Sequence, residues 1–406
     1  MYKRQRLDCG AVDLLRLHRV AVPLRAPVRA SHGTETVRDS TLVEVRDDSG
    51  ATGWGECPAL THPTYTSEYA AGAWRMLRDE LGPAALAGQG GAVRGHAMAR
   101  FALESALADL RLRLAGCPLA DALAGAVVGC GGAAASARDE AARGAGSPVA
   151  RRRRVGRTTV LGRRIDAESA WPAPPVRAAR RAIDALVAEA GAAADAGARL
   201  VKVKVEPGWD RAPLTELRAA FPGLALAADA NGSYAGCGPG ALDWVETLQL
   251  DYLEQPLDPD DLVGHARLQD RLAATPVALD ESLASLGLLA AAVALGAGRR
   301  FSLKPSRLGG LLGPARAAAV TPGCFVGGMF ELGVWRAAAL ALASLGPFEL
   351  PCDLGPSSQY LEDDVTEPVV LDAAGDLVVP DAPGIGVEVR AERVAAAAVE
   401  VVELRP

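Results

Sequence analysis

A nearly constant step of 24 to 26 residues runs through the second half of this 406-residue chain. It separates short apolar runs of strand-forming residues, and a segment of helical composition rich in Ala and Leu follows each run. One strand and one helix together fill such a step. The residues that mark the steps are Lys204, Asp229, Glu254, Asp280, Lys304, Met329 and Asp353.

Seven strands with this spacing predict an α/β fold of the (β/α)-barrel type. Parallel strands that are apolar throughout need helices on their outer side, and closure into a barrel covers all of them. A weak candidate for one more strand lies near Val160. A doubly wound open sheet is the alternative, but no Gly-rich phosphate-binding fingerprint follows an early strand.

Composition restricts the classes of partner. Half of the residues are hydrophobic and 23% are charged, so the chain can bury a large core. The formal net charge of −6 argues against nucleic acid or a membrane surface as the partner. No apolar run resembles a secretory signal or a membrane span of about 20 residues. Seven cysteines without a CxxC pair predict reduced thiols. We therefore expect a cytoplasmic protein that acts on a small molecule.

The first third of the chain has a different pattern from the barrel half. It predicts a compact α+β module that ends near residue 125. Its expected strands and helices span Val20–Leu24, Thr41–Arg46, Ser67–Leu86 and His96–Ala115. Residues 128–175 are irregular and rich in Arg, Gly, Ala and Pro, which favours a solvated loop or insertion over a docking patch for an anionic partner. A strand can still lie within Thr158–Ile165.

Three acidic residues end consecutive predicted strands. The carboxyl ends of barrel strands meet at one mouth, so Asp229, Glu254 and Asp280 are expected to lie side by side. Three adjacent carboxylates repel one another unless a cation neutralises them, and ligation by oxygen alone suits Mg²⁺ better than Zn²⁺. The sequence therefore predicts a magnesium site, although any one of these acids alone is more typical of a helix cap or an exposed side chain.

Lysines lie on the strands that flank the acids. Lys202 and Lys204 are two residues apart, so both side chains leave the same face of one strand. We expect like-charge repulsion to lower the pKa of each, which would make an amine a base near neutral pH. Lys304 is expected on the opposite wall. Lysines across a Mg²⁺ site favour removal of the proton α to a carboxylate, with the metal holding the enediolate.

A non-catalytic protein that keeps the fold is the alternative from another class. It is disfavoured because an abandoned site has no reason to retain several buried charges.

These residues belong to motifs that resemble the enolase superfamily, in its branch with a KxK lysine pair. The matching segments are Val201–Lys204, Asp229–Asn231, Leu253–Pro256, Leu279–Ser282 and Lys304–Pro305. The segment Gly327–Arg336, with Pro351–Asp353 after it, is similar to the o-succinylbenzoate synthase / N-succinylamino acid racemase family. Ala26–Arg29 and Gly53–Cys57 resemble the capping domain of that family.

The resemblance implies a modified barrel of the (β/α)7β type, with an α+β capping domain built from both chain ends and the active site between them. The expected segments are a capping domain at 1–127, an irregular stretch at 128–175 that can hold the first barrel strand, a barrel at 176–355, and a return to the capping domain at 356–406.

The resemblance also implies roles for individual residues. Lys204 is the expected base and acid, and Lys304 steadies the enolate or acts as a second base. Asp229, Glu254 and Asp280 are expected to bind Mg²⁺, for which Mn²⁺ can substitute. Asn231 and Glu281 are expected to orient the metal ligands or the catalytic lysines, and Lys202 is expected to tune Lys204. The expected substrate-binding residues are Gly327, Gly328, Met329, Arg307, Ser31, Arg29 and Tyr65.

The activity that the resemblance implies is a lyase reaction, the syn dehydration of 2-succinyl-6-hydroxy-2,4-cyclohexadiene-1-carboxylate to o-succinylbenzoate, a step toward menaquinone. Racemisation of N-succinylamino acids is the alternative, and Arg307 occupies a position associated with racemase-capable members. The implied partner is a small carboxylate. The resemblance leaves open whether the chain forms a homo-oligomer. Trp335, Leu332 and Ser306 depart from the residues usual in this family and put the outline of the pocket in question.

Overall fold

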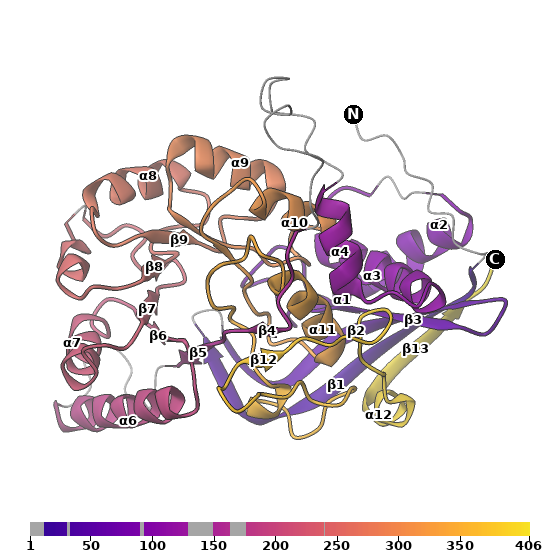
Figure 1. The fold of residues 1–406 in the computed structure, drawn as a ribbon, viewed down its shortest axis with the longest axis horizontal. Coiled ribbons are helices and arrows are strands. Elements are labelled where there is room, and N and C mark those ends of the chain that lie inside the picture. The colour runs from indigo at the N-terminus through magenta and orange to yellow at the C-terminus, as the bar shows by residue number, and fades with distance from the viewer. Residues whose placement is uncertain (1–11, 31–32, 90–92, 129–148, 163–175, 239) are drawn as a thin grey trace.

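The computed structural model describes residues 12–30, 33–89, 93–128, 149–162, 176–238 and 240–406 (Figure 1). These residues form a capping β-sheet with helices and a barrel-like parallel sheet beside it. In the part of the chain described, no helix combines the length and the apolar character needed to cross a membrane.

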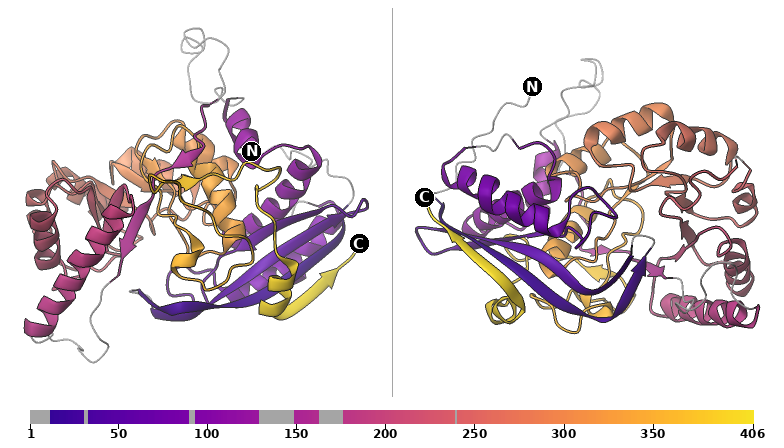
Figure 2. Two further views of the ribbon diagram at one scale, coloured as in Figure 1. Left: turned by 60° about the horizontal axis from the view of Figure 1, so that its bottom comes forward. Right: turned by 180° about the vertical axis from the view of Figure 1, so that it is seen from behind.

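The capping sheet is antiparallel and has four strands in the order β13-β1-β2-β3. Its strands are β1 (Val12–Ala30), β2 (Gly33–Asp47), β3 (Thr52–Cys57) and β13 (Ala398–Leu404). Strand β13 pairs with β1, with Leu404 opposite Leu15, so residues from the two ends of the chain share one sheet. Figure 2 shows this yellow strand along the indigo strands.

Helices cover one face of the capping sheet. They are α1 (Ala70–Met76), η1 (Leu77–Leu81), α2 (Gly82–Leu86), α3 (Ala97–Leu114) and α4 (Leu119–Val128). Helix α3 lies so close to β3 that the contact requires glycine. A Cβ atom on Gly55 would lie 1.9 Å from the carbonyl oxygen of Ala102, and one on Gly53 would lie 2.3 Å from that of Ala106. The Gly-Trp-Gly segment is thus explained by packing.

The second unit is a parallel sheet of seven strands in sequence order from β5 to β11. The strands are β5 (Thr158–Leu161), β6 (Leu200–Lys204), β7 (Leu226–Asp229), β8 (Tyr252–Glu254), β9 (Val277–Leu279), β10 (Arg300–Ser302) and β11 (Cys324–Phe325). Figure 1 shows β5 to β9 following one another along a curve, with α6 to α9 on the outer side.

An irregular segment at Cys352 closes this sheet into a barrel. The amide of Cys352 donates to the carbonyl of Gly156, and its carbonyl accepts from Thr158, at 3.0 and 2.8 Å. Asp353 donates to the carbonyl of Val326 beside β11 at 2.9 Å. The segment therefore connects the first and last strands, and the (β/α)7β fold predicted from the resemblance is confirmed.

Helices and short elements complete the chain. The barrel helices are α6 (Val176–Asp195), α7 (Arg211–Ala220), η2 (Asp243–Thr247), α8 (Leu262–Arg271), α9 (Leu286–Leu295), α10 (Leu312–Ala318) and α11 (Gly333–Ala343). The remaining elements are β4 (Arg154–Val155), η3 (Ser357–Gln359), β12 (Leu377–Val378) and α12 (Ala391–Ala397).

The irregular stretch 128–175 contains the first barrel strand, β5. Residues 129–148 and 163–175 within it lie outside the described residues. The consecutive arginines before β5 make contacts inside the chain: Arg151 and Arg153 both pair with Asp381, and Arg154 pairs with Asp372. These contacts favour the interpretation as an insertion that packs on the chain's own C-terminal part.

Alternate residues of the strands form two layers inside the barrel. The lower layer is a small apolar cluster made of Leu200, Ala227, Tyr252, Ala278 and Phe325, all buried. Side chains two residues further along a strand point the same way. The layer above this apolar floor therefore contains Lys202, Asp229, Glu254 and Asp280, and it faces the barrel mouth.

The capping domain is joined to the barrel through a buried carboxylate. Glu56 of β3 accepts hydrogen bonds from the backbone amides of Leu332 and Trp335 at 2.8 and 2.9 Å. These amides belong to the start of α11, where helix N–H groups have no partner inside the helix. The side chain of Trp335 packs against Phe101 of α3, with ring centroids 6.3 Å apart. Helix α11 is thus fixed to the capping domain on two sides.

A pair of alanine substitutions tests the packing of α3 on β3. Gly55→Ala should lower the free energy of unfolding by about 1–3 kcal/mol, because the new methyl group overlaps backbone atoms of α3. Gly125→Ala is the matched control, because its Cβ would meet nothing within 4 Å on an exposed helix position. It should raise stability by up to about 1 kcal/mol. Urea denaturation compares the two, and equal stability of both variants would contradict this packing.

Candidate active site

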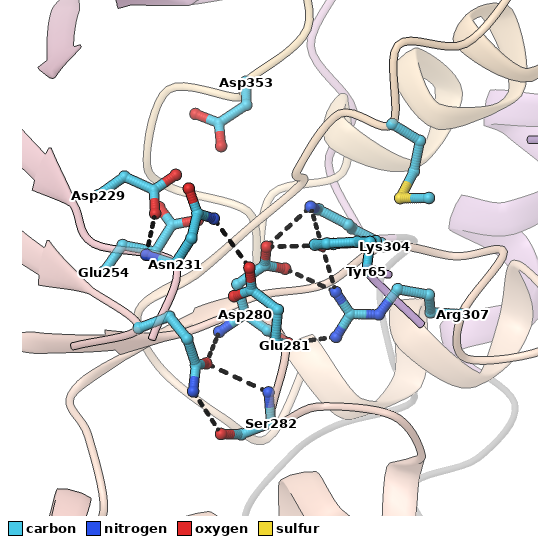
Figure 3. Close-up of polar contacts among 12 residues, drawn as sticks. Tyr65, Asp229, Asn231, Glu254, Asp280, Glu281, Ser282, Lys304, Arg307 and Asp353 are labelled. Carbon is cyan, nitrogen blue, oxygen red and sulfur yellow. Dashed lines mark hydrogen bonds and ion pairs between the residues drawn. The ribbon is translucent and has the colours of Figure 1, made fainter. Parts of the chain in front are cut away.

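The three acidic strand ends lie side by side at the mouth of the barrel (Figure 3). In the sheet register, Asp229 is the partner of Lys204 on one side and of Glu254 on the other. Glu254 is opposite Ala278, two residues before Asp280, so Asp280 leaves the same face. All three carboxylates are at most 3% exposed. The structure therefore brings together the three residues that the spacing singled out.

Lys202 lies beneath these acids and is enclosed by carboxylates. Its ammonium is 2.7 Å from Glu254 Oε2, 2.5 Å from Asp353 Oδ2 and 3.8 Å from Asp229 Oδ2. Burial alone would lower the pKa of Lys202, but Asp353 and Glu254 outweigh it and raise that pKa well above its ordinary value. The expectation that the lysine pair lowers the pKa of Lys202 is therefore wrong. The sequence does not reveal that buried carboxylates enclose Lys202 and dominate the shift of its pKa.

Lys204 points from the same strand toward the barrel mouth. Its ammonium donates to Asp229 Oδ2 at 2.7 Å and to Asn231 Oδ1 at 2.6 Å. The side chain is 26% exposed, whereas that of Lys202 is 3% exposed. Asn231 in turn donates from Nδ2 to Glu281 Oε1 at 2.8 Å. Of the two lysines on this strand, Lys204 is therefore the one accessible to a ligand.

Lys304 lies across the acids from Lys204, beyond β7, β8 and β9. Its ammonium contacts Asp280 Oδ2 at 2.8 Å and the hydroxyl of Tyr65 at 2.7 Å. Arg307 donates to Asp280 Oδ1 at 3.0 Å and to the Tyr65 hydroxyl at 2.7 Å. Tyr65 comes from the capping domain and also donates to Asp280 at 2.9 Å. Asp280 is thus the point where a capping residue meets the barrel cations.

The charges shift the pKa values of these acids in different directions. Burial would raise the pKa of Asp280, but Lys304 and Arg307 hold it well below its ordinary range. Burial raises the pKa of Glu281 to about 7, and the neighbouring Asp280 and Asp229 add to this effect. Burial also raises the pKa of Glu254 well above its usual value, against the opposing effect of Lys202. Burial therefore disfavours the charged forms of Glu254 and Glu281, whereas the neighbouring cations favour the charged form of Asp280.

The chemistry of these side chains fits a hard divalent cation. As the side chains stand, no three Asp, Glu, His or Cys groups in the described ranges have the geometry of a metal-binding cluster. Each candidate ligand lies in an ion pair with Lys202, Lys204 or Lys304 instead. Yet the acids are adjacent, buried and all oxygen donors, which is the ligand type that Mg²⁺ prefers. Next to these acids, the carboxylate oxygens Glu281 Oε2 and Asp353 Oδ1 are buried and have no hydrogen-bond partner among the described residues.

A cavity of about 480 Å³ lies above these charges. Capping residues Pro27, Leu60 and Tyr65 form part of its wall, and the barrel forms the rest. The candidate site thus lies between the two units. The barrel residues that line the cavity include Val160, Lys202, Lys204, Asp229, Asn231, Glu254, Asp280, Lys304, Gly328, Met329 and Asp353.

The predicted substrate-binding residues divide into three groups. Gly328, Met329 and Tyr65 line the cavity. Gly327 and Arg307 lie behind it, and a Cβ atom on Gly327 would be 2.6 Å from Lys304 Cε, so this glycine permits the lysine's position. The side chain of Arg29, and Ser31 as a whole, lie outside the described residues.

Several residues at the site were missed by the sequence analysis. Asp353 marks the last 24-residue step of the barrel pattern, and this position could have identified it as a residue at the barrel mouth. Phe330, Glu331, Gln359 and Tyr360 also line the cavity, from loops whose course the sequence does not reveal.

The three departures from the family pattern do not line the cavity. Leu332, Trp335 and Ser306 are all fully buried and lie away from its lining. Trp335 faces the capping helix α3. These substitutions therefore affect the support of the site, and the outline of the pocket is formed by other residues.

Comparison with known proteins supports a family assignment. A family model described as enolase C-terminal domain-like matches residues 185–394. The chain is 35% identical to an o-succinylbenzoate synthase of Geobacillus stearothermophilus, with 93% of each chain covered. It is also 35% identical to an N-succinylamino acid racemase of Amycolatopsis sp., with 91% of this chain and 93% of the relative covered.

A solved structure has the same fold. It is described as a probable mandelate racemase of Alicyclobacillus acidocaldarius, and it superposes with a TM-score of 0.79 at 33% identity, covering 97% of this chain and 99% of that chain. With the register of the strand ends, these matches show that the chain is an enzyme of the enolase superfamily and belongs to its o-succinylbenzoate synthase / N-succinylamino acid racemase family.

Proposed function

We propose that this chain is a divalent-metal-dependent o-succinylbenzoate synthase. It would dehydrate 2-succinyl-6-hydroxy-2,4-cyclohexadiene-1-carboxylate to o-succinylbenzoate, a step toward menaquinone. The observation that carries the proposal is the pair of lysines, Lys204 and Lys304, on opposite sides of a row of three buried carboxylates. This arrangement suits a reaction in which a proton next to a carboxylate must be removed.

Asp229, Glu254 and Asp280 would hold the metal ion. When bound, Mg²⁺ supplies positive charge against the negative charge that develops on the substrate carboxylate. Mn²⁺ is expected to substitute for it, since the donors are all oxygens.

Lys204 would remove the α-proton, because it is the more exposed lysine of its strand and reaches the cavity. The same group would then return the proton to the departing hydroxyl, which a syn elimination allows because the proton and the hydroxyl leave from the same face. Lys304 would face the opposite side of the substrate and stabilise negative charge with its ammonium. Asn231 and Glu281 would orient Lys204, since Asn231 contacts both Lys204 and Glu281.

Racemisation of N-succinylamino acids is the second candidate. In that reaction, Lys204 and Lys304 would take and deliver the proton on opposite faces of the same carbon. Arg307 favours this candidate, because it occupies a position associated with racemase-capable members of the family; in the structure it contacts Asp280 and Tyr65. The racemase of Amycolatopsis sp. is as similar to this chain as the synthase of Geobacillus stearothermophilus. Parallel assays of the two substrates would decide which reaction dominates.

Removal of the metal and of Lys204 tests the lyase mechanism. EDTA should stop dehydration, and added Mg²⁺ should restore it. Lys204→Ala should lower kcat by about 10²–10⁴-fold, the usual contribution of a positioned general base. Arg271→Ala is a suitable control, because it removes only an exposed ion pair with Asp243. Normal turnover of Lys204→Ala by the spectrophotometric assay would contradict the assigned role.

A second test separates one-base from two-base chemistry. With N-succinylamino acid enantiomers in D₂O, Lys204→Ala should keep α-proton exchange with one enantiomer only, and Lys304→Ala should keep it with the other. Each variant should lose interconversion of the two enantiomers, because each lysine serves one face of the carbon. ¹H NMR follows the exchange. Retention of exchange with the same enantiomer by both variants would exclude the two-base mechanism.

A further inference from the structure

We propose that Gln255 is a positioning residue whose side-chain amide holds Asp280 in place for metal binding. The inference rests on the metal site proposed above, and it concerns a residue that does not line the cavity. Its prediction is that metal affinity depends on this one buried amide.

The side-chain oxygen of Gln255 holds the backbone around Asp280. Gln255 is fully buried and directly follows Glu254 at the end of β8. Its Oε1 accepts from the backbone amide of Asp280 at 3.0 Å and from that of Ser282 at 3.2 Å. A single atom therefore holds the chain on both sides of Glu281, in the segment that directly follows β9.

The side-chain nitrogen of Gln255 fixes the orientation of the amide. Its Nε2 donates to Ser282 Oγ at 2.8 Å and to the carbonyl of Leu257 at 3.2 Å. It also lies 3.4 Å from Nε2 of His265, whose Nδ1 is directed at the carbonyl of Asp261. Because acceptors surround Nε2 and donors surround Oε1, the amide has one satisfactory orientation.

The backbone of Gln255 links three neighbouring strand ends. Its amide donates to the carbonyl of Ala278 in β9 at 2.8 Å, and its carbonyl accepts from Gly232, just beyond β7, at 2.7 Å. The residue has a φ of 37°, in the left-handed region that is unfavourable for side chains other than glycine. The surrounding hydrogen bonds must stabilise this conformation.

This support matters because the side chain of Asp280 is attracted away from its fellow acids. Lys304, Arg307 and Tyr65 all bind its carboxylate from the far side. A carboxylate that must also face Glu254 needs a fixed backbone, since a metal site tolerates only small displacements of its ligands. Gln255 supplies that fixed point from the side of Glu254.

The chain contains a matched control at the other end of the same strand. Gln269 of α8 is 8% exposed, and its Oε1 accepts from the amide of Val277, where β9 begins, at 2.8 Å. Its Nε2 donates to the carbonyls of Leu272 and Thr275. Gln269 and Gln255 thus perform the same kind of backbone fixation on one strand, but only Gln255 acts next to the candidate ligand.

The experiment compares Mn²⁺ binding by the full chain and two variants, with isothermal titration calorimetry and thermal unfolding of the metal-free proteins. Gln255→Leu should raise the Kd for Mn²⁺ by about 10–100-fold, the usual effect of losing a residue that orients a ligand. Gln269→Leu should lower Tm but leave the Kd within about twofold, because the strand end at Asp280 keeps its own support. Gln255→Asn, which keeps an amide on a shorter side chain, serves if Gln255→Leu does not fold, and it should weaken binding in the same direction.

Two results would overturn the inference while the proposed function survives. One is a wild-type Kd in the Gln255 variants, and the other is an equal loss of affinity in Gln269→Leu, which would indicate general destabilisation. A wild-type chain that binds no Mn²⁺ would overturn the proposed metal site together with this inference.

Discussion

Concentration of like charge in a buried space is the constraint on which the rest of this structure depends. Asp229, Glu254, Asp280 and Asp353 lie close together, and a buried carboxylate is stable only when it is paired or well hydrogen-bonded. The three lysines and Arg307 provide this pairing. The apolar layer below excludes water, so the same charges act more strongly on one another than they would at a surface. A site of this kind is costly to build and is well suited to stabilising charge on a ligand.

Much of the barrel could be predicted from the sequence, because each strand must be apolar and each must end at the mouth. The regular step identified the strands from β6 to β11 and the residues at their ends. The first strand was harder to recognise, because β5 lies in an arginine-rich stretch. The closing segment at Cys352 was recognised only as an apolar run, and its pairing was not predicted, since that pairing is irregular and uses isolated hydrogen bonds.

Contacts between distant parts of the chain could not be predicted. The bonds from Tyr65 to Asp280 and Lys304 span more than 200 residues, and no local pattern indicates them. The expected direction of the pKa shift of Lys202 was wrong for the same reason, because its partner Asp353 lies in the closing segment of the barrel, 151 residues further along the chain. Gln255 shows a further limit: the sequence places a polar residue after Glu254, but only the fold shows that its amide serves the neighbouring strand.

The pairing of β13 with β1 has a consequence for synthesis. A ribosome makes β1, β2 and β3 before the barrel and β13 after it, so the outer edge of β1 lacks its neighbour while the whole barrel is being translated. An unpaired strand edge readily associates with other chains. A nascent polypeptide of this design is therefore exposed to misassembly until β13 has emerged, and chaperone protection would be of greatest value during that interval.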